Sequence, residues 1–134
     1  MEEADQVSSL DGENVISLET YRKNGDPVRT PVWFLQDDGV IYVHTGGRTG
    51  KVKRIRQNTK VKIAPSTFRG KPKADYVDAT AVLETSADTV GKYYSLIYKK
   101  YGVVGSLTKF IQRFSRSKTK DVIIMIRTQS QGQE

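Results

Sequence analysis

The chain has 134 residues, which suffices for one domain but is too short for two independent hydrophobic cores. It contains no cysteine, so disulfides, thiolate metal sites and cysteine nucleophiles are excluded together. The net charge of +7 and the isoelectric point near 9.6 favour an anionic partner: nucleic acid, an anionic membrane surface or a phosphorylated small molecule.

The two ends of the chain differ in composition from its middle. The first residues, MEEADQVSSLDGEN, are acidic and polar, so they do not form a secretory signal. No apolar run approaches the roughly 20 residues needed to cross a bilayer, and we expect a cytoplasmic protein. Residues 1–10 and 129–134 are predicted to be flexible, on either side of a single domain at 11–128.

Three strands are predicted in the first third of the chain. The segment 14–23, NVISLETYRK, has the composition of a strand, and the Asn-Gly pair in KNGDP after it predicts a hairpin turn. The strands VRTPVWFLQ at 28–36 and VIYVHT at 40–45 follow, separated by the turn DDG. Pro31 cannot donate a backbone hydrogen bond, so its strand is predicted to lie at a sheet edge or to carry a bulge.

The rest of the chain mixes helices and strands. A short helix is predicted at 48–57, because Val52 and Ile55 are spaced to face the core together. A helix at 87–102 carries a predicted apolar stripe of Val90, Tyr94, Ile97 and Tyr101, with Gly102 as its C-cap. Further elements are strands at 60–67, 76–86 and 121–128 and a helix at 106–116. This order predicts a mainly β fold, a six-stranded antiparallel barrel with flanking helices.

One stretch, VHTGGRTGKVKRIRQN at 43–58, joins a strand end, a loop and a helix start. Gly46 and Gly47 allow positive φ or close approach of a ligand, and Thr49 is the expected N-cap. The first turn of a helix offers unpaired amides to a phosphate, and Lys51 and Lys53 add positive charge. The alternative is a solvated basic helix with an ordinary threonine cap.

Few other residues point to chemistry. His44, the sole histidine, is either a polar residue at a strand end or a ligand contact. Trp33 shares a strand face with Pro31 and Leu35, and is either core or a platform for a flat ring. No nucleophile, general-base pair or metal cluster is evident, so no catalytic residue is identified. If the protein is an enzyme, a cofactor must carry the chemistry.

The motif RTPVWF, followed by V-x-T-G and T-G-K-V-K-R-I-R-x-N-x-K-V, resembles the pyridoxamine 5′-phosphate oxidase-like superfamily. It is most similar to the small members that depend on the deazaflavin coenzyme F420, over residues 14 to 85 and again in the closing stretch. The resemblance implies an FMN-binding type of split β-barrel, a homodimer with F420 or FMN between its protomers. The implied cofactor-binding residues are Pro31, Val32, Trp33, His44, Thr45, Thr49, Gly50, Lys51 and Lys53.

Two departures from the family refine the expected function. True pyridoxamine 5′-phosphate oxidases carry an additional C-terminal segment with a substrate-binding arginine and histidine, which this sequence lacks, so that activity is not expected. Gly50 stands where FMN-binding members commonly have an arginine near the phosphate, which favours F420. We expect an F420- or FMN-dependent oxidoreductase acting on a small organic substrate, or a non-catalytic binding protein for the same cofactors. Nucleic-acid binding is a third, less favoured alternative, because the cations are not interleaved with exposed aromatic residues.

Overall fold

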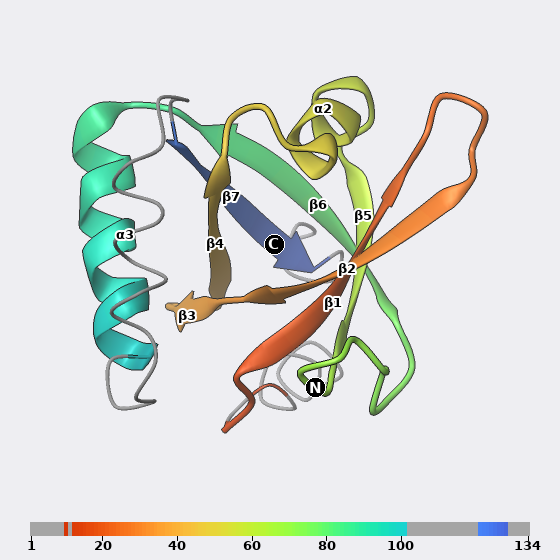
Figure 1. Cartoon of the computed structure of the whole chain (residues 1–134), viewed down its shortest axis with the longest axis horizontal. Helices are drawn as coiled ribbons and strands as arrows, with labels where there is room; N and C mark the ends of the chain where they lie inside the picture. The colour runs from red at the N-terminus through yellow and green to blue at the C-terminus, as the bar shows by residue number, and fades with distance from the viewer. Residues whose placement is uncertain (1–9, 11, 102–120, 129–134) are drawn as a thin grey trace.

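The computed structural model describes residues 10, 12–101 and 121–128 of the chain (Figure 1). Seven antiparallel strands form one sheet in the order β2-β1-β5-β6-β7-β4-β3. The strands are β1 Val15–Tyr21, β2 Pro27–Trp33, β3 Leu35–Asp37, β4 Val40–Gly46, β5 Lys60–Pro65, β6 Val77–Glu84 and β7 Asp121–Thr128. The helices are α2 Gly50–Gln57 and α3 Ala87–Tyr101. The predicted mainly β, antiparallel fold is therefore confirmed.

The count of seven strands corrects the predicted six, because the expected strand at 28–36 divides at Phe34. Residues before it pair with β1, and residues after it pair with β4. The Phe34 amide donates to the Tyr101 hydroxyl at 2.9 Å, and its carbonyl accepts from Lys100 Nζ at 2.7 Å. Because α3 supplies these bonds, Phe34 leaves the sheet ladder without leaving its backbone groups unsatisfied.

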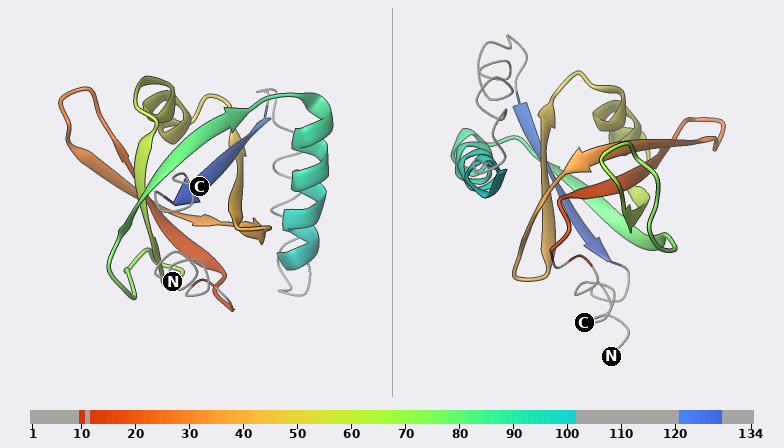
Figure 2. Two further views of the ribbon diagram at one scale, coloured as in Figure 1. Left: turned by 180° about the vertical axis from the view of Figure 1, so that it is seen from behind. Right: turned by 60° about the horizontal axis from the view of Figure 1, so that its bottom comes forward.

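The sheet curls because its two edge strands, β2 and β3, are consecutive in the chain. Only Phe34 separates them, so the edges of the sheet must approach each other, and the result is a half-barrel of the split-barrel type (Figures 1 and 2). The edge position of β2 confirms the prediction made from Pro31, which pairs with Ser17 of β1.

The interior of the half-barrel holds the main core. Ile16, Leu18 and Ile124 are fully buried there. On α2, Val52 and Ile55 are 0% and 1% exposed, which confirms the predicted inward face of this helix. The main core also includes Leu10, a residue predicted to belong to the flexible N-terminus. The domain boundaries themselves stay a prediction.

Helix α3 packs outside the half-barrel against β4 and β7, as Figures 1 and 2 both show. Its predicted stripe is confirmed for Ile97 and Tyr101, whereas Val90 and Tyr94 are only half-buried. The buried set also includes Tyr93 and Tyr98. The contact face is wider than the predicted stripe because aromatic side chains of the sheet, Tyr42 and Trp33, meet the helix. The predicted helix at 106–116 and Gly102 lie outside the described residues.

Both predicted tight turns are present. Gly25, in the first, has a φ of 93°, and Asp38 and Gly39, in the second, have φ values of 53° and 79°. Left-handed backbone at these positions is what the Asn-Gly and Asp-Gly pairs accommodate best. In the part of the chain that the structure describes, neither helix combines the length and apolarity needed to cross a membrane.

Candidate functional site

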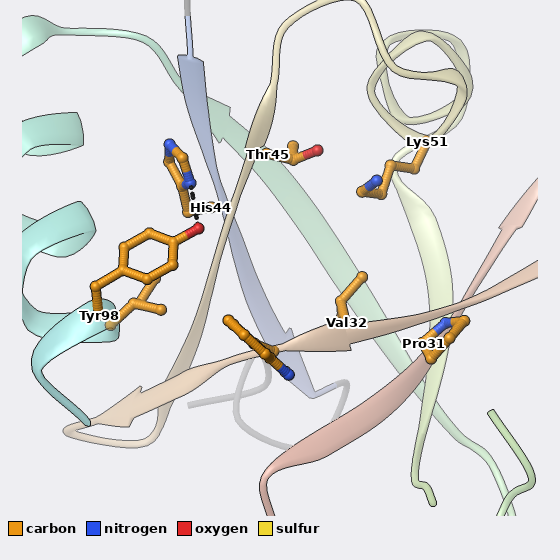
Figure 3. Close-up of a pocket in the computed structure, with 8 residues that line it drawn as sticks. Pro31, Val32, His44, Thr45, Lys51 and Tyr98 are labelled. Carbon is orange, nitrogen blue, oxygen red and sulfur yellow. Dashed lines mark hydrogen bonds between the residues drawn. The ribbon is translucent and has the colours of Figure 1, made fainter. Parts of the chain in front are cut away.

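A pocket of about 270 Å³ opens where β2, β4, α2 and α3 meet (Figure 3). Lys51 reaches in from α2 and Tyr98 from α3, with Thr45 and Val32 between them. The lining consists of Pro31, Val32, Trp33, His44, Thr45, Lys51, Ile97 and Tyr98. Six predicted site residues from two strands and a helix are thus brought together. Ile97 and Tyr98 were not predicted, because a tyrosine on an amphipathic helix face is typical of packing.

The other predicted site residues lie outside this lining. Lys53 is exposed, because it follows Lys51 by two helical positions, or about 200° around the axis. Thr49 occupies the N-cap position of α2, but its hydroxyl makes no capping bond to a helix amide and donates to the Gly46 carbonyl at 3.0 Å. Thr49 is therefore confirmed as the N-cap residue, but without a side-chain capping bond. Neither Gly46 nor Gly47 has a positive φ, which leaves close approach of a ligand as the predicted use of the two glycines.

The start of α2 is strongly electropositive. Its first turn contains no acidic residue, and no side chain caps its amides. The Arg54 guanidinium lies over Gly50, where an added Cβ would come within 2.7 Å of Nη1, and Arg54 Nε donates to the Thr20 hydroxyl at 2.6 Å. Burial lowers the pKa of Lys51, and the charge of Arg54 lowers it further. An anion at the helix start would relieve this repulsion.

Arg54 was missed by the sequence analysis, although a spacing of four residues places it on the helix face of Gly50. Among the described residues, the ion pairs involve neither Lys51 nor Arg54. The position of Arg54 also weakens the argument from Gly50 against FMN, because an arginine stands beside the helix start after all.

The opposite wall of the pocket is aromatic. Trp33 stacks on Tyr101 with ring centroids 4.8 Å apart and an angle of 12°, and it meets Tyr98 edge-on at 6.3 Å. Trp33 is half-buried and also lines the pocket. Its packing against α3 confirms the predicted core role and holds the ring in a fixed orientation beside the open space, whereas its role as a platform for a flat ring stays a prediction.

His44 is held by residues from two other elements. Nδ1 lies 3.2 Å from the Tyr98 hydroxyl, and Nε2 lies 3.2 Å from Oδ2 of Asp121, an ion-pair distance when the ring is protonated. The side chain is 1% exposed. Burial lowers the pKa of His44, and the Asp121 carboxylate opposes this shift. His44 is thus a well-packed strand residue that also borders the pocket.

The sequence as a whole matches one family. The model of the family described as pyridoxamine 5′-phosphate oxidase covers residues 2–129. The chain belongs to this family. Among curated proteins, no relative matches the sequence significantly. The family predicted from the RTPVWF and TGKVKRIR motifs is therefore confirmed.

Solved structures share the fold of this pyridoxamine 5′-phosphate oxidase family member at low identity. A Listeria innocua protein described as a pyridoxamine 5′-phosphate oxidase has a TM-score of 0.67 and 18% identity, covering 96% of this chain and 94% of that one. The heme storage protein HutZ from Vibrio cholerae has a TM-score of 0.67 and 14% identity, covering 96% of this chain and 89% of that one. An F420 reductase has a TM-score of 0.60 and 20% identity, covering 90% of this chain and 91% of that one. At these identities the similarity establishes the fold alone.

The described residues of this family member contain no group of histidine, aspartate and glutamate side chains arranged to hold a metal ion. The polar groups of the pocket are the imidazole of His44, the hydroxyls of Thr45 and Tyr98, and the ammonium of Lys51. Such a set can bind an anion and exchange protons, but it contains no carboxylate to attract a cation.

The lowered pKa of His44 predicts a pH-dependent stability of this family member. A folded-state pKa below the ordinary value of 6.5 means that the unfolded chain binds this proton more tightly. The contribution to stability is therefore fully present above pH 6.5 and is lost as pH falls through the folded-state pKa. Urea unfolding between about pH 7 and pH 5 should show a smaller loss for His44→Gln than for the wild type. Equal losses would contradict the prediction.

Proposed function

We propose that the chain is an F420- or FMN-dependent oxidoreductase that binds the cofactor in the pocket and transfers hydride to a small organic substrate. One observation carries this proposal: the cations at the start of α2 and the aromatic wall at Trp33 border the same space. A phosphorylated flavin or deazaflavin has a matching shape, with an anion at one end and a flat ring system at the other. The F420 reductase with the same fold supports the chemistry by analogy.

The residues present fit the two ends of such a cofactor. Lys51 and the uncapped first-turn amides of α2 would hold the phosphate, with Arg54 adding charge and Thr45 a hydroxyl. Pro31, Val32 and Trp33 would contact the ring system along β2. The exposed Lys53 would add only long-range attraction. When bound in its reduced form, the cofactor supplies a hydride from its central ring.

The size of the pocket favours a homodimer. At about 270 Å³, the pocket lies below the range of about 300 to 1,000 Å³ usual for small-molecule sites. A second copy of the chain would enclose the part of the cofactor that one copy leaves exposed. We therefore propose the dimeric arrangement that the family resemblance implies, with F420 as the preferred cofactor and FMN as the alternative.

The proposed function is tested by titrating the purified full-length chain separately with F420 and with FMN, followed by fluorescence. We expect a dissociation constant below about 100 µM, or roughly −5.5 kcal/mol, for at least one of them. Sedimentation should give the mass of two chains. The reduced complex should then lose its electrons to an enone or quinone, as seen by absorbance. Absence of binding for both cofactors would contradict the proposal.

A second candidate is a protein that binds the cofactor without turnover. The heme storage protein with the same fold supports this candidate by analogy. A complex that binds cofactor tightly but transfers no hydride to any of a panel of enones and quinones would favour the binding protein.

A further inference from the structure

We propose that Tyr98 is the proton donor of the pocket, and that His44 and Asp121 form the relay that returns a proton to it. The inference rests on the proposed function, because adding a hydride to a polarised double bond leaves an anion that must be protonated. It assigns roles to three residues for which the sequence showed no catalytic pattern.

The three side chains come from three elements. Tyr98 lies on α3, His44 on β4 and Asp121 at the start of β7. The Tyr98 hydroxyl lies 3.2 Å from Nδ1 of His44, and Figure 3 shows it pointing from α3 toward the imidazole. Asp121 Oδ2 lies 3.2 Å from Nε2 on the other side of the ring. The imidazole therefore lies between the hydroxyl and the carboxylate.

The strand register explains why Asp121 reaches His44. In the β4–β7 ladder Asp121 is paired with Gly46, two residues along the same strand from His44. Residues two apart on a strand share a face, so Asp121 and His44 are diagonal neighbours. Gly46 has no side chain between them. A glycine at the directly opposed position therefore leaves the carboxylate room to contact the imidazole.

The solvent exposure of the side chains decreases from Asp121 to His44, as a proton relay from water to the pocket requires. The Asp121 side chain is 23% exposed, whereas that of His44 is 1% exposed. Tyr98 and His44 border the pocket itself. A proton can therefore enter from water at Asp121, cross the buried imidazole and arrive at the hydroxyl beside the pocket.

The charged and titratable groups around the imidazole favour a donor at Tyr98. The imidazole is faced by Asp121 from β7 and by Tyr94 and Tyr98 from α3, with Lys51 of α2 lining the same pocket. Burial raises the pKa of Tyr98, and Tyr94 and Asp121 raise it further, so the hydroxyl keeps its proton at neutral pH. The raised pKa also makes the phenol a weaker acid, so the transfer requires Nδ1–H of His44 to stabilise the phenolate as the proton leaves.

In the imidazolium form, Nδ1–H of His44 donates to the Tyr98 oxygen and Nε2–H faces Asp121, so the Tyr98 O–H is available to the substrate. A reduced cofactor in the pocket would supply a hydride, whose electron pair would form the new bond at one atom of the double bond, and the π electrons would move to the other atom. That atom takes the Tyr98 proton, the phenolate takes the Nδ1 proton, and neutral His44 is recharged by water. The substrate gains two electrons and two protons in total.

The first test needs no cofactor. His44 is the only histidine in the sequence, so ¹H–¹⁵N spectra of untagged protein contain a single imidazole. We expect Asp121→Asn to lower its titration midpoint, because the opposing carboxylate charge is removed. Tyr98→Phe should shift the Nδ1 resonance. Tyr93→Phe, on the same helix but stacked on Tyr42 outside the pocket lining, is the matched control and should leave Nδ1 in place. An imidazole unmoved by both Asp121→Asn and Tyr98→Phe would overturn the relay.

The second test uses the cofactor-loaded chain and an enone acceptor. We expect Tyr98→Phe to lower kcat about 100-fold while cofactor affinity stays within about threefold, and Tyr93→Phe to retain the wild-type kcat. Wild-type kcat should fall as pH rises through the His44 pKa, and Asp121→Asn should move that fall to lower pH. Equal kcat in Tyr98→Phe and Tyr93→Phe would overturn the proposal. If the cofactor does not bind at all, the proposed function fails, while the spectra still decide whether the three groups are coupled.

Discussion

Lys51→Ala is expected to weaken binding of F420 or FMN about 10- to 100-fold. A hydrogen bond to a charged group contributes about 1.5–3 kcal/mol, and each 1.4 kcal/mol is a factor of about ten in affinity. Lys51 lines the pocket, and burial and the neighbouring Arg54 both lower its pKa. Keeping the Lys51 ammonium charged in this place costs free energy, and a bound phosphate would offset part of that cost. The contribution of Lys51 to binding should therefore exceed that of an exposed lysine. Fluorescence titration of wild type and variant measures the difference.

Lys53→Ala is the matched control for this prediction. It removes the same charge from the same helix, but Lys53 is exposed and lies outside the pocket lining. Solvent and salt screen such a charge, so affinity should stay within about threefold. If the two variants lose affinity equally, the effect belongs to the overall charge of α2, and no specific contact at Lys51 is needed.

Tyr101→Phe is expected to lower the free energy of unfolding by about 1–3 kcal/mol. The Tyr101 hydroxyl accepts from the Phe34 amide at 2.9 Å and lies 2.6 Å from the Asn14 carbonyl. Tyr101 and Phe34 are each 1% exposed, so the variant would leave the buried Phe34 amide without a partner, while the Phe34 carbonyl keeps its bond from Lys100. Each unsatisfied buried group costs about 1–3 kcal/mol. Urea unfolding monitored by circular dichroism measures the change.

Tyr94→Phe makes the same chemical change on a half-buried position of α3 and should cost less than about 1 kcal/mol. If Tyr101→Phe were as stable as Tyr94→Phe, the hydroxyl could not be what satisfies the break between β2 and β3. Tyr101→Phe keeps the ring that stacks on Trp33, so the pocket wall should stay in place.

The parts of the fold that local chemistry controls could be predicted from the sequence. Asn24–Gly25 and Asp38–Gly39 mark turns because few residue pairs accept left-handed backbone. Val52 and Ile55 mark the inner face of α2 through helical spacing. The break at Phe34 was missed because no proline or glycine marks it. Its cause is a set of bonds to Tyr101, 67 residues away, which no local pattern reports.

The candidate site likewise has a part that local sequence predicts and a part that depends on long-range contacts. The site residues on β2, β4 and α2 lie within the motif that carried the family resemblance. Tyr98 lies 54 residues from His44 and sits on a helix face that looks like ordinary packing. Asp121 is diagonal to His44 only because of the β4–β7 register. Thr49 has the residue type of an N-cap, yet its hydroxyl turns back to Gly46, a choice between two acceptable bonds that composition cannot decide.

The central claim is that Lys51 and the start of α2 hold the phosphate of the cofactor. It is tested most directly by measuring the affinities of a phosphorylated flavin and its unphosphorylated form, FMN and riboflavin, for wild type and Lys51→Ala. If the chain prefers the deazaflavin, the same pair is used with and without its phosphate group. We expect Lys51→Ala to weaken the phosphorylated ligand about 10- to 100-fold and to leave the unphosphorylated one within about threefold. An equal loss for both ligands, or no preference of the wild type for the phosphate, would contradict the account.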